Sequence, residues 1–316
     1  MRPFAFVFPG QGSQSVGMLD AWGDHPEVRA CLKEASAALG EDLAALIHAG
    51  PKEQLALTAN TQPVMLVAAI ASWRAWRAAG GALPSVVAGH SLGEYSALVA
   101  AGALTLAQAV PLVRLRAAAM QEAVPVGTGA MAAILGLDAS KVVEACRRIT
   151  RELDGAGGEV VEAVNFNTPV QTVIAGTRAA VDRACAALKA EGAKRALMLP
   201  VSAPFHSSLM KPAAERLKSA LAAVEFKTPE IPVVNNVDVA VETDPGRIRD
   251  ALYRQAFSPV RWVETLHKIK AMGADLVIEC GPGKVLAGTV ARTDDALAAA
   301  ALFDPATLAE ASALLA

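Results

Sequence analysis

The stretch Gly89-His90-Ser91-Leu92-Gly93 decides the fold class, because an apolar run leads into it and a helical pattern leads out of it. Residues 84–88 (PSVVA) have the character of a short buried strand, and residues 94–100 (EYSALVA) that of a helix. Glycines two positions before and two after the serine allow a sharp turn, since they lack the Cβ atoms that would collide there. Such a turn exposes the serine hydroxyl, so the pattern predicts an α/β fold with Ser91 as a nucleophile.

The chain length and composition fit an α/β protein of enzyme size. With 316 residues the chain can bury a large core, either as one large domain carrying an insertion or as two domains. Hydrophobic residues make up 53% of the sequence and aromatic residues only 4%. This balance suits close-packed helices around a sheet better than an aromatic-rich β-sandwich.

Short apolar runs predict the strands of the main part of the fold, and most of them are followed by a glycine- or asparagine-containing loop and a helix. A long alanine-rich helix is expected from Thr61 to Ala79, with Pro63 in its first turn and its end at Gly80-Gly81. This alternation predicts a parallel sheet with helices on both faces. The predicted strands are 4–8, 85–88, 231–234 and 275–279.

The region 128–200 has a different order of expected strands and helices, which predicts an inserted subdomain. Its elements follow the ferredoxin-like order βαββαβ, and glycines at 154–158 indicate a turn within it. We therefore expect a large α/β domain made of residues 1–127 and 201–316. The expected elements of the insertion are strand 130–137, helix 140–153, strands 160–165 and 171–175, helix 179–191 and strand 195–199.

Charge and cysteine spacing argue against several classes of protein. The formal net charge is −2, so no global basic field favours nucleic acid or an anionic membrane as a partner. No apolar stretch approaches the roughly 18 residues of a membrane span. The four cysteines form no CxxC pair, so we predict no metal site, no disulfide framework and a reducing, cytoplasmic location. We also expect a monomer.

A serine nucleophile needs a general base, and the sequence offers five histidines. His90 precedes the serine on a sharp turn that points its ring away, so we expect it to support the site structurally. His206 lies in the segment 203–208 (APFHSS), where the chain returns to the main domain at the cleft, and we predict that it is the base. The alternative is a loop histidine that caps a helix. The other three are expected on the surface: His25, His48 and His267.

Arg116 is the second unusual residue. On the helix expected over 105–124 it shares one stripe with Val113 and Met120, which places its guanidinium on the apolar side. A charge there needs an anionic partner, and its planar fork suits a carboxylate held by two parallel hydrogen bonds. The alternative is a structural ion pair with an aspartate or glutamate of the protein.

Two glycine-rich loops are candidate ligand-binding loops, and they lead to different predictions. Residues 9–14 (PGQGSQ) directly follow the first strand, at the edge where open α/β sheets hold ligands, although such a turn can also be only a tight connection. Residues 281–285 (GPGKV) do not form a phosphate loop, because Val285 occupies the position that needs a hydroxyl.

Taken together, these motifs closely resemble the bacterial malonyl-CoA:acyl carrier protein transacylase family. The resemblance covers almost the whole chain and implies a hydrolase-like α/β core with a ferredoxin-like inserted subdomain, in agreement with the element pattern. The segments that carry it, in the family's order, are 6–14 (FVFPGQGSQ), 89–96 (GHSLGEYS), Arg116, 165–167 (NFN), 205–206 (FH), 232–238 (PVVNNVD), 254–255 (RQ) and 279–285 (ECGPGKV).

The resemblance implies a role for each matching residue. Ser91 would accept the acyl group and His206 would act as its base, in a dyad without a carboxylate third member. Gln255 matches the position whose backbone carbonyl orients the imidazole. Arg116 matches the clamp for the malonyl carboxylate.

Further matches concern the rest of the site. Gln11 and Leu92 match the residues whose backbone amides form the oxyanion hole. Asn167 matches a polar residue near the site. Leu92 and Phe205 resemble the residues of malonyl rather than methylmalonyl enzymes, because bulk there would crowd an α-methyl group.

The resemblance implies transfer of the malonyl group from malonyl-CoA to the phosphopantetheine thiol of acyl carrier protein, without a cofactor, for fatty-acid synthesis. The alternatives are a malonyl transferase of a malonate decarboxylase or polyketide system, a serine thioesterase and a non-catalytic carrier-binding scaffold. The carrier is acidic in this family, so a local basic rim is expected. Its candidates are Lys189, Lys194, Arg195 and Lys211.

Overall fold

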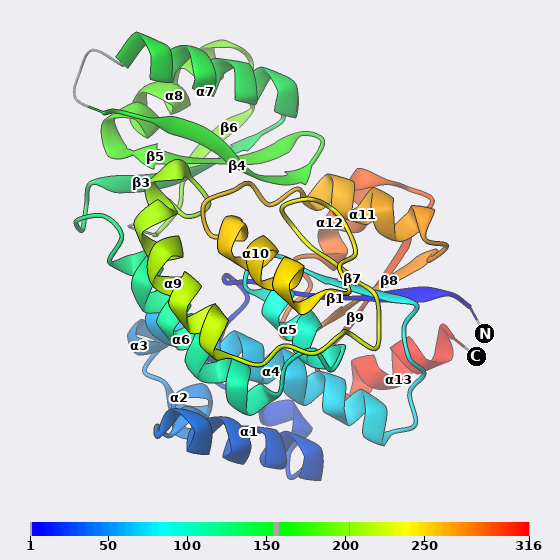
Figure 1. Cartoon of the computed structure of the whole chain (residues 1–316). Helices are drawn as coiled ribbons and strands as arrows, with labels where there is room; N and C mark the ends of the chain where they lie inside the picture. The colour runs from blue at the N-terminus through cyan, green and yellow to red at the C-terminus, as the bar shows by residue number, and fades with distance from the viewer. Residues whose placement is uncertain (1, 154–157, 202, 316) are drawn as a thin grey trace.

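The computed structural model describes residues 2–153, 158–201 and 203–315, which form two β-sheets (Figure 1). The turn predicted at 154–158 falls, except for Gly158, outside these residues. The large sheet has five parallel strands in the order β7-β2-β1-β8-β9, which confirms the predicted parallel sheet. Its strands are β1 (Phe4–Phe8), β2 (Val86–Gly89), β7 (Val233–Val234), β8 (Leu276–Cys280) and β9 (Ala298–Leu302).

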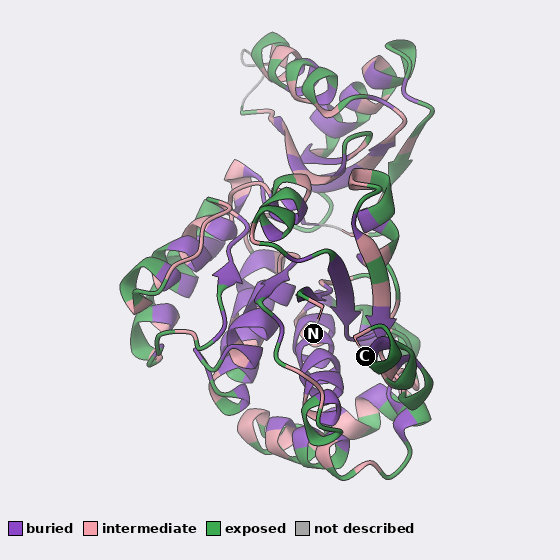
Figure 2. Ribbon diagram, turned by 90° about the vertical axis from the view of Figure 1, so that its right-hand side faces the viewer, coloured by how far each residue is buried: buried purple, intermediate pink, exposed green. Residues whose placement is uncertain are grey.

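Helices cover both faces of the large sheet, because successive strand residues point to opposite sides. The phenylalanines of β1 pack with α4 (Thr58–Ala78) in one hydrophobic cluster, and the Phe6 ring lies 5.6 Å from the ring of Trp73. Val7 points the other way and packs with α11 (Trp262–Ala271). Figure 2 shows the buried residues gathered on the central strands and the helices against them.

The remaining helical elements outside the region 128–200 surround this sheet or connect its strands. They are η1 (Asp20–Trp22), α1 (Pro26–Leu39), α2 (Leu43–Ala49), α3 (Lys52–Ala56), α5 (Gly93–Ala100), α6 (Leu106–Gln121), η2 (Ser208–Met210), α9 (Lys211–Ala223), α10 (Pro245–Gln255), α12 (Ala287–Thr293) and α13 (Pro305–Ala313).

The small sheet has four antiparallel strands in the order β4-β5-β3-β6. The helices α7 (Ala139–Leu153) and α8 (Arg178–Ala190) pack on one face with a hydrophobic cluster of their own (Figure 1). On the other face, Met131, Val164 and Val173 cluster with Phe205 of the following segment. The observed order βαββαβ agrees with the prediction, while the domain boundaries at 127/128 and 200/201 stay a prediction. The strands are β3 (Gly129–Leu135), β4 (Val161–Thr168), β5 (Gln171–Thr177) and β6 (Arg195–Met198).

The start of α4 differs from the sequence prediction. The amides of Asn60 and Thr61 both donate to the carbonyl oxygen of Leu57 at 2.8 Å, so the helix begins at Thr58, three residues before the predicted start. Pro63 therefore lies in the second turn and not in the first, which corrects the prediction. The helix ends beside Gly80, where φ is 79°, as the glycine pair indicated.

Two strands also differ from the prediction. β9 was not predicted, because its sequence AAAAL has the alanine content of a helix. It nevertheless pairs in parallel with β8 at the edge of the sheet, with Ala298 opposite Leu276. The predicted strand 231–234 is reduced to Val233–Val234, since Pro232 has no N–H to donate to a neighbouring strand.

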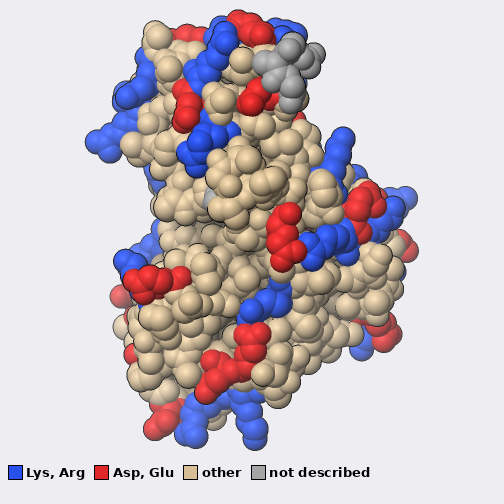
Figure 3. Space-filling model, turned by 90° about the vertical axis from the view of Figure 1, so that its left-hand side faces the viewer, with Lys and Arg blue, Asp and Glu red and all other residues tan. Residues whose placement is uncertain are grey.

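Charges and candidate metal ligands are dispersed over the part of the chain that the structure describes. Within it, no group of three or more histidine, cysteine, aspartate or glutamate side chains could hold a metal ion. No helix there is long and apolar enough to cross a bilayer. On the face drawn in Figure 3, positive and negative side chains are interspersed, and the area where the upper and lower parts meet is mostly uncharged.

Candidate active site

Ser91 lies on the turn between β2 and α5, with a φ of 54°. The glycines on either side are required by close approach: a Cβ on Gly89 would collide with the backbone of Gly93, and a Cβ on Gly93 with the carbonyl oxygen of Phe8. A left-handed conformation is unfavourable for a serine and needs support from the surrounding structure. The predicted sharp turn is therefore present.

Asn236 provides part of that support. Its Oδ1 accepts a hydrogen bond from the Ser91 backbone N–H at 2.7 Å, and its Nδ2 donates to the carbonyl oxygen of Gly89 at 2.7 Å. The amide thus joins the residues on both sides of the bend, and it is fully buried. These bonds stabilise the backbone of the turn that carries Ser91.

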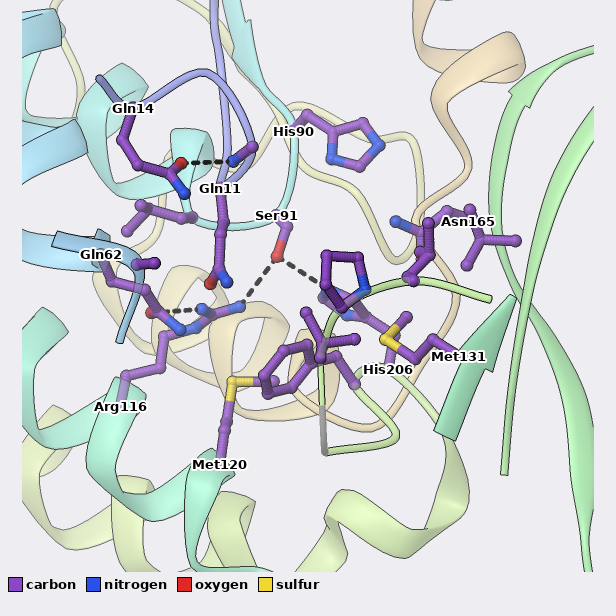
Figure 4. A pocket seen from close by; sticks show the side chains of 18 residues that line it. Gln11, Gln14, Gln62, His90, Ser91, Arg116, Met120, Met131, Asn165 and His206 are labelled. Atoms are coloured by element: carbon purple, nitrogen blue, oxygen red, sulfur yellow. Dashed lines mark hydrogen bonds between the residues drawn. The ribbon is translucent and has the colours of Figure 1, made fainter. Parts of the chain in front are cut away.

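The side chain of His206 lies within hydrogen-bond distance of Ser91, although the two residues are 115 positions apart in the chain. Its Nε2 lies 2.7 Å from Ser91 Oγ (Figure 4), and its Nδ1 lies 2.9 Å from the backbone oxygen of Gln255. Because a carbonyl only accepts hydrogen bonds, Nδ1 carries the proton and Nε2 is left to accept one from the serine. This is the tautomer that a general base needs.

The environment of His206 keeps the imidazole neutral. Burial lowers the pKa of His206 to about 3, and the positive charge of Arg116 contributes to the same shift. The residue has a φ of 64° and is 3% exposed. Near neutral pH the imidazole is therefore almost entirely neutral, and its Nε2 is free to accept the serine proton.

Arg116 lies beside the serine on α6, whose start carries the capping box formed by Thr105 and Gln108. Its Nη1 donates to Gln62 Oε1 at 2.6 Å, and its Nη2 donates to Ser91 Oγ at 3.1 Å (Figure 4). The same Nη2 also donates to Gln255 Oε1 at 2.9 Å. The side chain is 1% exposed.

Among the described residues no carboxylate forms a hydrogen bond with Arg116. Burial lowers the pKa of its guanidinium, whereas Tyr95 and Glu94 oppose this shift. None of its hydrogen bonds goes to a carboxylate, and the Nε atom has no hydrogen-bond partner among the residues that the structure describes. The alternative of a structural ion pair, which the sequence left open, is therefore not what is observed in the described residues.

A cavity of about 390 Å³ brings these groups together. Gln11, Leu92 and Arg116 line it from the large sheet and its helices, and Met131 and Val173 line it from the small sheet. This volume is within the range of small-molecule binding sites. Gln11, Gln62 and Arg116 lie on one side of Ser91, and Met131 and Asn165 lie on the other (Figure 4).

The structure places the remaining predicted residues as follows. Gln11 and Leu92 line the cavity with Ser91. Asn167 contacts His90 instead, with 2.8 Å between Asn167 Oδ1 and His90 Nε2. Asn165, on the same strand, lines the cavity. A direct contact between Asn167 and a substrate stays a prediction.

His90 points away from the serine hydroxyl, as expected (Figure 4). Its ring packs against that of Trp262 at 5.5 Å between centroids. Burial lowers the pKa of His90, which favours the neutral form. This arrangement agrees with a supporting role.

Sequence reasoning did not assign roles to three buried polar residues of the site, which are Gln62, Glu94 and Asn236. Burial raises the pKa of Glu94 to about 7, although its bonds to Gln255 and Asn236 and the charge of Arg116 lower it. A signal was present for Glu94 and Asn236, which lie in quoted motifs, but not for Gln62, which follows the polar residues Asn60 and Thr61. Their partners lie 54 to 161 positions away in the chain, which a single sequence does not reveal.

Comparison with known proteins agrees with this geometry. A family described as "Acyl transferase domain" matches residues 5–309. The chain belongs to this acyl transferase family. This acyl transferase is 55% identical to the malonyl CoA-acyl carrier protein transacylase of Salmonella typhimurium, over 98% of this chain and 99% of the relative.

Solved structures of the family have the same fold. The acyl-carrier-protein S-malonyltransferase of Burkholderia pseudomallei is 61% identical to this acyl transferase, with a TM-score of 0.95 over 98% of this chain and 99% of that chain. A malonyl-transacylase solved in complex with its type II PKS acyl-carrier protein is 51% identical, with a TM-score of 0.95 over 99% of each chain. The α/β fold predicted from the sequence is thereby confirmed.

Proposed function

We propose that this acyl transferase moves the malonyl group from malonyl-CoA to the phosphopantetheine thiol of an acyl carrier protein, for fatty-acid synthesis. One observation supports the proposal: the Ser91–His206 pair, 2.7 Å apart, shares a cavity with a buried guanidinium that forms no hydrogen bond to a carboxylate within the described part of the chain. The pair can form an acyl-enzyme, and the guanidinium can select an acyl group that ends in a carboxylate.

In the first half-reaction Ser91 Oγ attacks the thioester carbon while His206 Nε2 takes its proton. The resulting oxyanion would accept hydrogen bonds from the backbone amides of Gln11 and Leu92, each worth about 3 kcal/mol in the transition state. The tetrahedral intermediate then expels the thiolate of coenzyme A, which takes the proton from His206. A malonyl-serine ester remains.

In the second half-reaction the thiol of the carrier gives its proton to His206 and attacks the ester carbonyl. The intermediate collapses by breaking the bond to Ser91 Oγ, which recovers its proton from His206. Double displacement follows from these two steps. These steps use the serine, the imidazole and the thioester, and they need no further cofactor. The protein is proposed to act in the cytoplasm, since its four free cysteines fit a reducing compartment.

Arg116 gives the proposed reaction its selectivity. An acetyl group has no carboxylate and would leave the buried guanidinium without an anionic partner, which costs a few kcal/mol. The side chains of Leu92 and Phe205 also line the cavity, and their bulk favours malonyl over methylmalonyl groups.

A malonyl transferase of a polyketide system is the second candidate, because one solved relative is held in complex with a type II PKS acyl-carrier protein. The chemistry at the serine is the same in both pathways, so the carrier distinguishes them. Rates of transfer to a fatty-acid carrier and to a polyketide carrier, measured side by side, decide between the two.

Intact-mass measurement tests the proposal itself. Mixed with malonyl-CoA alone, the protein should gain one malonyl group and keep it, and addition of holo-carrier should remove the group and transfer it to the carrier. Continuous release of malonate without a carrier would instead indicate a thioesterase. Absence of any labelling would favour a non-catalytic scaffold.

The rate of Ser91 acylation should be insensitive to mild acid. Because the lowered pKa of His206 is about 3, the imidazole stays neutral, and activity should be lost only as the pH falls through that low value. We expect kcat/KM for malonyl-CoA to be constant from about pH 7.5 to 5. A base with the ordinary pKa of 6.5 would instead lose about nine-tenths of its activity by pH 5.5.

This pH experiment needs one control, because burial raises the pKa of Glu94 to about 7, within the same range. The Glu94→Gln variant cannot titrate at this position and should have the same flat profile as the wild type. A fall with a midpoint near 6.5 in both proteins would contradict the neutral His206.

The predicted basic rim can be tested by charge reversal. All four candidates are exposed. Lys211 is the first residue of α9 and follows His206 closely in the chain. Arg195 is the first residue of β6 and lies four residues, or about 13 Å of strand, before Leu199, which lines the cavity. Lys211→Glu should therefore reduce kcat/KM for the carrier most, by about fivefold, and leave malonyl loading unchanged. Lys189→Glu changes the candidate on α8 and should have a smaller effect on the carrier. If Lys211→Glu lowered malonyl loading and transfer to the carrier equally, the predicted rim would be refuted.

A further inference from the structure

Glu94 is a buried carboxylate next to the catalytic turn that the proposed reaction does not use. It is the second residue of α5 and is 2% exposed. Its Oε2 accepts two hydrogen bonds, from the backbone N–H of Asn236 at 2.9 Å and from Gln255 Nε2 at 2.8 Å. Neither donor carries a charge, so these contacts are not an ion pair.

The bond to Glu94 fixes the direction of the Gln255 amide. The Nε2 end of that amide donates to Glu94 and to the backbone oxygen of Ser91 at 3.0 Å, and the Oε1 end accepts from Arg116 Nη2 at 2.9 Å. An amide has donors at one end and an acceptor at the other. If it turned over, its NH₂ group would face the guanidinium and its oxygen would face the carboxylate, and the buried contacts at both ends would be lost.

The orientation of Gln255 determines how Arg116 is held. Two neutral amide oxygens, from Gln62 at 2.6 Å and from Gln255 at 2.9 Å, fix the guanidinium beside Ser91 without neutralising its charge. A glutamate directly on Arg116 would occupy the fork that a substrate carboxylate needs. Because Gln255 stands between Glu94 and Arg116, no described hydrogen bond pairs the guanidinium with a carboxylate, and its Nε–H has no partner among the described residues.

We infer that Glu94 is a positioning residue for acyl-group selectivity: it orients the Gln255 amide so that the amide oxygen holds Arg116 ready for the substrate carboxylate. This inference rests on the proposed function, because it concerns the recognition of the malonyl group. Glu94 acts through Gln255 and touches neither the serine hydroxyl nor the guanidinium by any described hydrogen bond.

The test is a competition between malonyl-CoA and acetyl-CoA for the serine, read by intact mass at early times. The ratio of the two acyl-enzymes gives the ratio of the two kcat/KM values and is independent of the fraction of folded protein. Glu94→Leu removes the acceptor, so the ratio should fall at least about tenfold, or 1.4 kcal/mol, chiefly through a higher KM for malonyl-CoA. A purely structural role would lower both rates and leave the ratio unchanged.

Glu94→Gln is the matched control. A glutamine can place its oxygen where Oε2 now lies and keep both hydrogen bonds, and its NH₂ group can face the small second cavity that Glu94 also lines. The ratio should stay within about threefold of the wild type. A tenfold loss in this variant would contradict the inference even if Glu94→Leu does not fold.

A second pair of variants tests the route through Gln255. Gln255→Met removes the amide but keeps the backbone oxygen that contacts His206, and it should lower the ratio about as much as Glu94→Leu. Because the two residues act in series, the double variant should lose no more than either single one, about tenfold and not a hundredfold.

The outcomes separate the two hypotheses. A wild-type protein that does not take up malonyl groups refutes the proposed function. A malonyl-selective wild type whose Glu94→Leu or Gln255→Met variant keeps the full ratio, or whose double variant shows additive losses, refutes only the role of Glu94.

Discussion

Replacement of Ser91 by alanine is expected to abolish the acyl-enzyme and to lower malonyl transfer by about 10⁴-fold or more. The hydroxyl is the group that lies 2.7 Å from the imidazole and 3.1 Å from the guanidinium, and in the proposed mechanism no other side chain can form the ester. Intact mass after mixing with malonyl-CoA measures the loading, and transfer to a holo-carrier measures the overall rate.

Ser96→Ala is the matched control for this substitution. Ser96 lies on α5, is 1% exposed, and its hydroxyl has no hydrogen-bond partner among the residues that the structure describes. Its loss should therefore change neither loading nor transfer. The nucleophile assignment would be wrong if the Ser91 variant still gained a malonyl group at a rate near that of the wild type.

Replacement of Arg116 by methionine should lower kcat/KM for malonyl-CoA by about 10³-fold, since an unpaired substrate carboxylate in a buried site costs about 2–5 kcal/mol. The rate with acetyl-CoA should be unchanged or higher, because acetyl groups no longer leave a buried cation unpaired. Competition between the two thioesters measures both effects, and the preference for malonyl groups should disappear.

Arg114→Met provides the comparison on the same helix. Arg114 lies two residues earlier, and its Nη2 donates to Glu41 Oε2 at 2.6 Å, away from the cavity. This variant should retain the preference for malonyl-CoA. If Arg116→Met lost malonyl and acetyl activity to the same extent, the guanidinium would be a structural element and not a selectivity clamp.

The main features of the fold could be predicted because they depend on local patterns. The turn around Ser91 needs glycine at two fixed positions, and the helical spacing that Arg116 shares with Val113 and Met120 indicated its burial. Both are properties of a few consecutive residues. β9 was missed for the same reason, since four alanines in a row favour a helix locally, and only pairing with β8 makes them a strand.

The candidate site was predicted only in part, because much of it consists of contacts between distant segments. The family resemblance led to Gln255 and its backbone contact with His206, but not to the side-chain bonds of Gln255 with Arg116 and Glu94. The anchoring of the Ser91 turn by Asn236 joins residues 145 positions apart. Such partners are fixed by tertiary packing, for which residue spacing in one sequence carries no signal.

The two sides of the cavity come from different parts of the chain. Met131 and Val173 belong to the small sheet and Val201 follows its last strand, whereas the nucleophile and the arginine belong to elements around the large sheet. None of the three apolar side chains hydrogen-bonds to the reacting groups. In the proposed mechanism Arg116 recognises the negative charge, whereas these three side chains, like Leu92 and Phe205, only limit the space in the cavity. We therefore expect that their exchange changes which substituents at the α-carbon are accepted and leaves the preference for a carboxylate unchanged, so that the steric and the ionic control of substrate choice can be altered separately.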